Sequence, residues 1–196
     1  MNNSSKRVNT VKLVGVALFT AIVVVLQYLG SFIKFGPFSI SLVLVPIVIG
    51  AALYGRTAGA WLGFVFGLAV LISGDAAAFL TINFVGTILV VLLKGTLAGL
   101  AAGAVYKAIE GKNITFAVIA SAIVCPVVNT GLFLLGSVVF FMDTIKTWAA
   151  GTNVFVFMIV GLVGFNFLFE LLVNVVLSPV IVRLIQVGTK AKIKSV

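Results

Sequence analysis

The sequence contains no histidine, and aspartate and glutamate together contribute only four of its 196 residues. Histidine is the commonest metal ligand and the most frequent general base in enzymes, so the usual forms of both kinds of site are excluded. A serine or cysteine nucleophile activated by histidine is excluded for the same reason. The four carboxylates are scattered along the chain and offer no pair for acid–base chemistry. We therefore expect a protein that is not an enzyme and that uses no metal and no cofactor.

Charge is scarce as well, because 9% of the residues are charged while 62% are hydrophobic, and the mean hydropathy is +1.34. A soluble domain of this length needs a far larger polar surface. The sequence therefore predicts an all-α, multi-pass protein of the cell membrane, in contact with the lipid bilayer. Its single cysteine, Cys125, lies in an apolar run and is expected to pack as a small hydrophobic residue.

The tripeptide Lys94-Gly95-Thr96 is similar to the end of a phosphate-binding loop. Such a loop needs glycine at the two positions that Ile88 and Leu93 occupy here, and the segment has the composition of an apolar helix. Hydrolysis of ATP by this chain is therefore excluded.

Thirteen lysines and arginines give the chain a formal net charge of +9. They are spread over the termini and short gaps, so they do not form the basic face that nucleic acid binding requires. Membrane topology explains them better, because cytoplasmic flanks retain lysine and arginine. If the N-terminus is cytoplasmic, the outer side holds only Lys34 and Lys146. The cytoplasmic side then collects Lys6, Arg7, Lys12, Arg56, Lys107, Lys112, Arg183, Lys190, Lys192 and Lys194.

Six apolar segments are punctuated by glycine, proline, serine or charge, at residues 11–29, 40–54, 57–72, 82–106, 114–141 and 154–187. A helix needs about 20 residues to span the hydrocarbon layer, so the second and third segments are short and the last two are long. The pattern predicts a compact bundle of six transmembrane helices with both termini in the cytoplasm. Only Gly55 and Arg56 join the short pair, which predicts a tight antiparallel hairpin with close packing of small residues.

No linker, low-complexity segment or internal repeat divides the chain, so residues 1–196 are expected to form one integral membrane domain. Residues 1–10 and 188–196 are expected to be basic cytoplasmic tails. The first apolar run follows basic residues, as in a signal peptide, but it is long and no clear cleavage motif ends it. It is expected to remain as the first transmembrane helix.

Three connections are expected on the outer side, at residues 30–39, 73–81 and 142–153. They hold residues that are unusual for solvated loops, namely Phe32, Phe35, Pro37, Phe38, Asp75, Phe79, Asp143, Trp148 and Asn153. One interpretation is an aromatic belt at the membrane interface, which is general in membrane proteins. The other is a lid that folds over an outward-facing cavity.

Lys94 and Glu170 lie near the middle of two apolar segments. A charge at that depth is costly and usually faces a partner or a solvated cavity. Glu170 shares one helix face with Asn166 and Asn174, because the three residues are spaced by four.

Asparagine residues on neighbouring segments fall at comparable depth when about 1.5 Å per residue is counted from the outer ends. Asn129 is placed near the midplane and Asn83 nearer the outside. We expect these side chains to line a polar pocket that opens outward. The alternative is a purely structural role, in which Lys94 and Glu170 form a buried ion pair and the asparagines join helices.

The first segment carries a patch of small residues made of Gly15, Ala17 and Ala21, of which the two alanines lie four apart on one helix face. Such a patch allows another helix to approach closely.

Three features together resemble an S component of the energy-coupling factor (ECF) transporters. They are Ala17-Leu18-Phe19-Thr20-Ala21, the six-helix layout, and the stretch from Gly36-Pro37-Phe38-Ser39-Ile40 through Val45-Pro46-Ile47 to Tyr54-Gly55-Arg56. The resemblance covers essentially the whole chain. It implies a subunit that captures a vitamin from outside with high affinity. It also implies partners, namely one transmembrane T subunit and two cytoplasmic ATPase subunits.

The same resemblance implies functional residues. Ala17 and Ala21 are expected to contact the T subunit. The substrate-binding residues are expected in the loops after the first and third helices and in the outer parts of the last three. They are Phe35, Phe38, Asn83, Lys94, Asn129, Asn166 and Glu170.

The vitamin is expected to be pantothenate, ahead of cobalamin, folate or riboflavin, because the overall similarity leans toward pantothenate-type members and Lys94 suits a carboxylate. That second argument is lost if Glu170 neutralises Lys94. Two other functions stay open. One is a self-sufficient ion-coupled carrier of small molecules that uses Lys94 and Glu170, and the other is a structural or regulatory membrane subunit.

Overall fold

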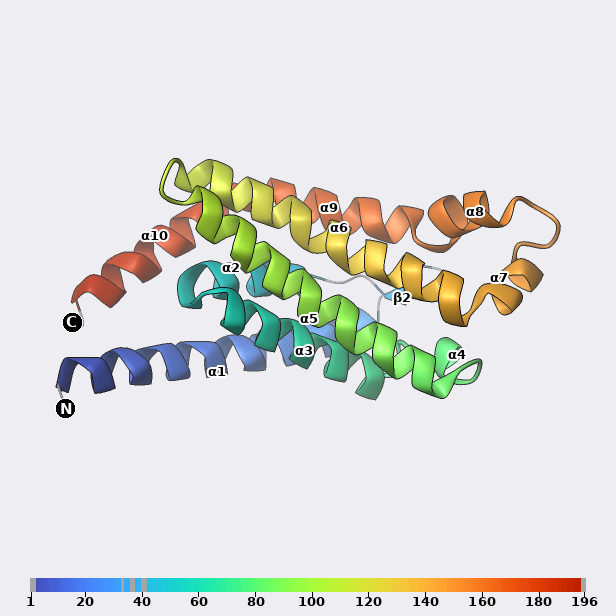
Figure 1. Cartoon of the computed structure of the whole chain (residues 1–196). Helices are drawn as coiled ribbons and strands as arrows, with labels where there is room; N and C mark the ends of the chain where they lie inside the picture. Colours follow the sequence, from blue (N-terminus) through green and yellow to red (C-terminus); the bar gives the residue numbers. More distant parts are fainter. Residues whose placement is uncertain (1–2, 33, 36–37, 40–41, 195–196) are drawn as a thin grey trace.

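In a computed structural model, the chain folds into a bundle of helices (Figure 1). The structure describes the backbone of residues 3–32, 34–35, 38–39 and 42–194, and the side chains of residues 10–32 and 42–188. The longer helices are α1 (Asn3–Ser31), α2 (Leu44–Tyr54), α3 (Arg56–Ile72), α5 (Phe84–Ile109), α6 (Ile114–Phe140), α9 (Gly164–Val176) and α10 (Ser178–Lys194). Short elements connect them, namely β1 (Lys34–Phe35), β2 (Phe38–Ser39), α4 (Ala77–Leu80), α7 (Met142–Trp148), α8 (Val154–Val156) and the π-helix η1 (Phe157–Leu162).

Three of these helices, α1, α5 and α6, are long and apolar enough to span a membrane, and the bent pair formed by α8–η1 and α9 makes a fourth candidate. The helices α2, α3 and α10 are apolar but shorter. Many large apolar side chains point outward, including Leu13 and Val139, which are 72% and 71% exposed. Lipid solvates such side chains, so the prediction of a helical membrane protein is confirmed. These three or four candidate spans do not confirm the predicted count of six crossings.

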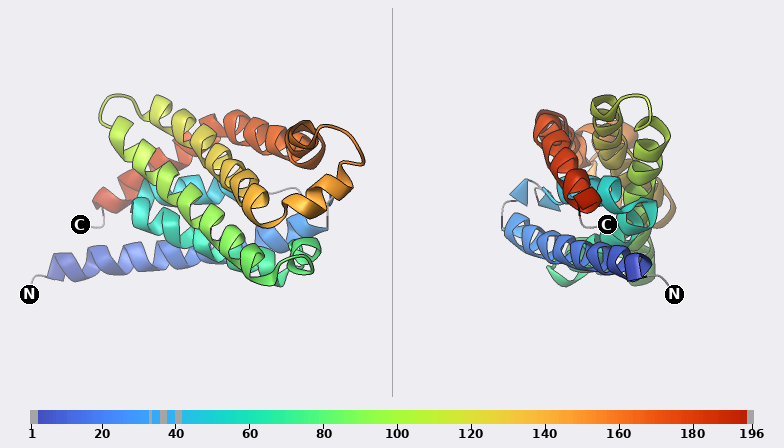
Figure 2. Two further views of the ribbon diagram at one scale, coloured as in Figure 1. Left: turned by 45° about the vertical axis from the view of Figure 1, so that its right-hand side comes forward. Right: turned by 90° about the vertical axis from the view of Figure 1, so that its left-hand side faces the viewer.

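Both ends of the described chain lie at the same end of the bundle (Figures 1 and 2). The connection between α5 and α6 lies at this end too, while α4 and α7 lie at the opposite end (Figure 1). The segments predicted as basic tails are partly helical, because α1 begins at Asn3 and α10 runs to Lys194.

The helix α2 forms the centre of the larger apolar core, where Leu44, Ile47 and Val48 are fully buried. Pro46 lies in its first turn, where a missing backbone N–H costs nothing because those groups have no partner within the helix. Gly55 follows with a φ of 93°, and α3 begins at the next residue. A positive φ suits glycine, so this single residue reverses the chain and the predicted hairpin is confirmed.

Glycines spaced by four line the contact between α3 and α5. A Cβ atom added to Gly63 would lie 1.9 Å from the carbonyl oxygen of Gly95, and one added to Gly99 would lie 2.0 Å from that of Gly59. The two backbones therefore touch, as in the packing of small residues that is typical of membrane helices. Small residues also bring α2 close to α3, since a Cβ on Gly59 would lie 2.7 Å from that of Ala51.

The last apolar segment is not one helix. It is divided into α8, η1, α9 and α10, and the α8–η1 part is bent by 43° from α9. The amide of Val163 donates to the carbonyl of Met158, five residues earlier, which widens the turn. Pro179 lies in the first turn of α10, where proline favours the start of a helix over its continuation.

We predict that Gly63→Ala destabilises the protein, because the new methyl group meets backbone that cannot move without separating α3 from α5. Overpacking of this kind costs about 1–3 kcal/mol, so the thermal midpoint of the purified protein should fall by several degrees. Gly131→Ala on α6 is the matched control, because nothing lies within 4 Å of the added Cβ. Equal midpoints for the two variants would show that the glycine contact does not hold the helices together.

Candidate functional site

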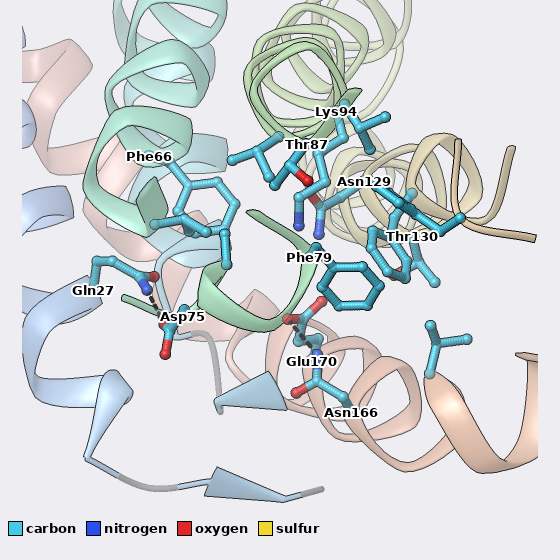
Figure 3. A pocket seen from close by; sticks show the side chains of 17 residues that line it. Gln27, Phe66, Asp75, Phe79, Thr87, Lys94, Asn129, Thr130, Asn166 and Glu170 are labelled. Atoms are coloured by element: carbon cyan, nitrogen blue, oxygen red, sulfur yellow. Dashed lines mark hydrogen bonds between the residues drawn. The ribbon is translucent and has the colours of Figure 1, made fainter. Parts of the chain in front are cut away.

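A cavity of about 70 Å³ lies among α3, α4, α5, α6 and α9, and the end of α1 reaches it (Figure 3). That volume holds several water molecules or a small polar group. Its wall combines apolar and polar side chains, which are Gln27, Phe66, Val70, Asp75, Ala76, Phe79, Thr87, Val90, Val91, Lys94, Asn129, Thr130, Phe133, Phe141, Val163, Asn166 and Glu170.

Lys94 enters this cavity from α5, next to the glycine contact with α3. Its ammonium nitrogen lies 5.7 Å from the ring centre of Phe66 and 5.6 Å from that of Phe133. A cation over an aromatic ring is stabilised by about 0.5–2 kcal/mol, depending on how far it is desolvated. The ion pairs within the described part of the chain are Lys107–Glu110 and Lys146–Asp143. Lys94 and Glu170 therefore do not form the buried ion pair of the structural alternative.

Glu170 and Asn166 enter from α9, one helical turn apart. The Asn166 amide donates to Oε1 of Glu170 at 3.1 Å. Glu170 is only 2% exposed, and its Oε2 is buried without a hydrogen-bond donor among the described residues. The Oδ1 atom of Asn166 is also buried without a hydrogen-bond donor among the described residues. This wall thus presents two acceptors that lack donors.

Asn129 on α6 is 4% exposed and supplies a third such acceptor, because its Oδ1 is buried and no donor reaches it within the described residues. Figure 3 shows the Lys94 and Asn129 side chains extending into the cavity from one side, while Glu170 and Asn166 extend from the other. An unsatisfied buried polar group costs about 1–3 kcal/mol. The arrangement is therefore one that a ligand, or water in its place, would stabilise.

The end of the cavity near α4 and α7 is covered by aromatic rings. Phe79 is buried, and its ring centre lies 5.4 Å from that of Phe133, 5.1 Å from Phe141 and 5.7 Å from Trp148. The rings come from α4, α6 and the segment of α7, so they join three parts of the chain. This packing agrees with the lid interpretation of residues 73–81 and 142–153, in which aromatic residues fold over a cavity.

A hydrogen-bonded tie joins α1 to the connection between α3 and α4. The buried side-chain amide of Gln27 donates to a carboxylate oxygen of Asp75 and, at 3.4 Å, to the hydroxyl of Ser73. Gln27 and Asp75 both line the cavity (Figure 3). The tie fixes the C-terminal end of α1 against the residues that precede α4.

The structure brings together Lys94, Asn129, Asn166 and Glu170 from three helices. Asn83 is not among the cavity residues, because its side chain caps α5 by accepting from the amide of Gly86 at 2.8 Å.

Two other expectations concern residues away from the described cavity wall. The side chains of Phe35 and Phe38 lie outside the described residues, although their backbones pair across β1 and β2. Asn174 is buried on the face it shares with Glu170, and its amide donates to the Glu170 backbone carbonyl at 2.8 Å.

Several cavity residues were missed by sequence reasoning, and some of them lie at helical spacing from those that were found. Phe133 lies four residues after Asn129, and Thr87 lies seven before Lys94, so each shares a face with a predicted residue. Gln27 is a carboxamide within an apolar run, which is a usable signal. Phe66 gives no such signal, because α3 contains three phenylalanine or tryptophan residues and the sequence does not show which of them faces the cavity.

The predicted small-residue patch on α1 is wrong in one member. Ala17 and Ala21 are exposed, between the exposed apolar side chains of Val14, Leu18 and Val25. Gly15 faces the other way, because a Cβ added there would lie 2.1 Å from the Tyr54 hydroxyl oxygen. Glycine is needed at that position to admit the Tyr54 side chain of α2. The exposed α1 face is therefore formed by the alanines and their apolar neighbours.

A family model described as "ECF transporter, substrate-specific component" matches residues 11–182, which is most of the chain. No curated protein and no solved structure matches. Members of this family bind small-molecule substrates and pair with T and ATPase components. The chain therefore belongs to the substrate-specific components of the ECF transporters, and it is a multi-pass membrane protein that serves as a substrate-binding subunit.

Proposed function

We propose that this chain is the high-affinity S subunit for import of a water-soluble vitamin, and that the vitamin binds in the cavity around Lys94 and Glu170. The observation that carries the proposal is that three of the five buried side-chain polar atoms without a partner among the described residues, on Asn129, Asn166 and Glu170, belong to residues that line one cavity. Membrane proteins rarely keep such groups without a function. The matched family supplies the function that fits them.

Lys94, Asn129, Asn166 and Glu170 form the proposed binding set within the described residues. Phe35 and Phe38, from the connection after α1, are proposed to complete it. Asn83 contributes only indirectly, through the cap that fixes the outer end of α5.

Pantothenate is the proposed vitamin, ahead of cobalamin, folate and riboflavin. Its carboxylate suits Lys94, and the absence of a Lys94–Glu170 ion pair among the described contacts leaves that cation available. Pockets for ligands of this size measure about 300–1,000 Å³. The cavity of about 70 Å³ is far smaller, so the aromatic cover formed by Phe79 and Trp148 is proposed to open when the vitamin enters.

The proposed topology has six crossings, both termini in the cytoplasm and the cavity toward the outside. Lys12, Arg56 and Lys107, from α1, α3 and α5, line one groove together with Gly188. Basic residues that are far apart in sequence therefore gather at one end of the bundle, which supports a cytoplasmic assignment for that end. The short helices α2, α3 and α10 are proposed to cross together with the irregular segments that flank them.

The exposed face of α1 around Ala17 and Ala21 is the proposed contact for the T subunit, and two ATPase subunits are proposed to supply the energy. Small residues on a lipid-facing helix let a second helix approach closely. The neighbouring Val14, Leu18 and Val25 add apolar surface to the same face.

We expect the isolated chain to bind one vitamin tightly without ATP and to transport it only with its ATPase partners. Mass spectrometry of the purified protein should identify the vitamin that purifies with it, and uptake into vesicles should require the complete complex. Uptake by the chain alone under an ion gradient would support the ion-coupled carrier instead.

Replacing both Ala17 and Ala21 with tryptophan should abolish assembly with the T subunit and leave vitamin affinity unchanged, because the face lies apart from the cavity. Co-purification measures assembly, and calorimetry measures affinity. Leu168→Trp with Leu172→Trp is the control, since these side chains are 62% and 60% exposed on α9 with the same spacing. Loss of both properties in the alanine variant would mean that the α1 face supports the fold.

A further inference from the structure

The cavity is lined by one cation, Lys94, and by three buried hydrogen-bond acceptors, two of which extend from the side opposite Lys94 (Figure 3). Lys94 supplies the cation, from α5, whereas the acceptors without donors come from α6 and α9. The other charged groups that line the cavity are Asp75, which accepts from Gln27, and Glu170. Each wall of the cavity therefore selects a different kind of chemical group.

The Lys94 wall requires an anion or another strong acceptor. An ammonium carries three donors and no acceptor, and the rings of Phe66 and Phe133 offer only their faces. No hydrogen bond joins Lys94 to another residue in the described part of the chain. A ligand carboxylate would fill this position with a charge-assisted hydrogen bond, about twice as strong as a neutral one.

The opposite wall requires donors. The Oε2 atom of Glu170 and the Oδ1 atom of Asn166 are buried acceptors on this wall, and Glu170 is more than nine-tenths buried. The Oδ1 atom of Asn129, which extends from the side of Lys94, is a third buried acceptor (Figure 3). A second anion placed here would be repelled by Glu170. Hydroxyl, amide or ammonium hydrogens would instead satisfy all three atoms.

No ion pair joins Lys94 to Glu170 among the described residues, although both side chains line one small cavity. The rings of Phe79 and Phe133, whose centres lie 5.4 Å apart, line the same cavity as these two charged groups. A lysine and a glutamate held apart beside a cavity can each bind one end of the same molecule.

We propose that the substrate is an organic acid with hydrogen-bond donors at its other end. The acid group binds Lys94, and the donors bind Glu170, Asn129 and Asn166. This assignment rests on the proposed function, and it excludes substrates that carry no acidic group, such as cationic thiamine. Pantothenate, with a carboxylate at one end and hydroxyls at the other, is one member of the class.

The test compares acids with their neutral counterparts on the purified full chain. The probes are pantothenate with pantothenol and biotin with biotin amide, together with any molecule that purifies with the protein. Calorimetry should give, for the acid that binds, an affinity at least about 10-fold above that of its neutral counterpart. Thiamine should not bind.

Two substitutions separate the walls. Lys94→Met should weaken the acid by about 10- to 100-fold and remove the preference over the neutral counterpart, whereas Lys94→Arg should keep the preference. Glu170→Gln should weaken both members of a pair by the same factor, because both keep their donors. Lys107→Met, the same change at an exposed position of α5, should alter nothing. Thermal midpoints establish that each variant is folded.

Three results would overturn the inference while leaving vitamin binding intact. They are a base or neutral molecule as the tightest ligand, an unchanged acid preference in Lys94→Met, and a selective loss of the acid in Glu170→Gln. Stabilisation by Na⁺ alone that Glu170→Gln removes would also overturn it, because the acceptors would then hold a cation. If no molecule binds or purifies with the chain, the proposed function fails first, and this inference fails with it.

Discussion

The direct contact between the backbones of α3 and α5 determines where the cavity lies. Helices in lipid gain little from the hydrophobic effect when they associate, so close packing has to hold them together. Gly59 and Gly63 on α3 meet Gly99 and Gly95 on α5, and no side chain separates them. Lys94 directly precedes Gly95, and the Phe66 ring would lie 3.3 Å from a Cβ on that glycine. The cation and its aromatic neighbour are thus positioned by the same contact that holds the two helices together.

Polar side chains in the bundle fall into two groups, those that bond within their own helix and those that keep a buried polar atom without a partner among the described residues. The hydroxyls of Thr87, Thr96 and Ser121 each donate to a carbonyl four residues earlier in their own helix. Such bonds satisfy a polar group without any partner from outside. The side-chain acceptors Oδ1 of Asn129 and Oε2 of Glu170 have no such partner within the described residues, although both side chains are buried. Three of the five buried polar atoms without a partner among the described residues, on Asn129, Asn166 and Glu170, belong to residues that line the cavity, and Ser137 and Asn174 hold the other two. This lack of partners is not visible in the sequence.

Sequence reasoning predicted those features that depend on one helix at a time. The shared face of Asn166 and Glu170 and the reversal at Gly55 both follow from spacing and residue type. It failed where rotation between helices or local backbone geometry decides. Gly15 faces Tyr54 because of how α1 is turned against α2, and Asn83 is used as a cap. The break of the last segment at η1 comes from a widened turn, which leaves no regular pattern in an apolar run.

The chain has two tryptophans, and the structure puts them in different neighbourhoods. The Trp61 indole donates to the hydroxyl of Thr20 at 3.1 Å, and so lies beside the α1 helix that presents Ala17 and Ala21. Trp148 packs edge-on against Phe79 over the cavity. Indole emission responds to nearby polarity, so two spectroscopic reporters are already built into the native protein. If either tryptophan is replaced by phenylalanine, the fluorescence of the other reports on its own surroundings alone, and no dye has to be added.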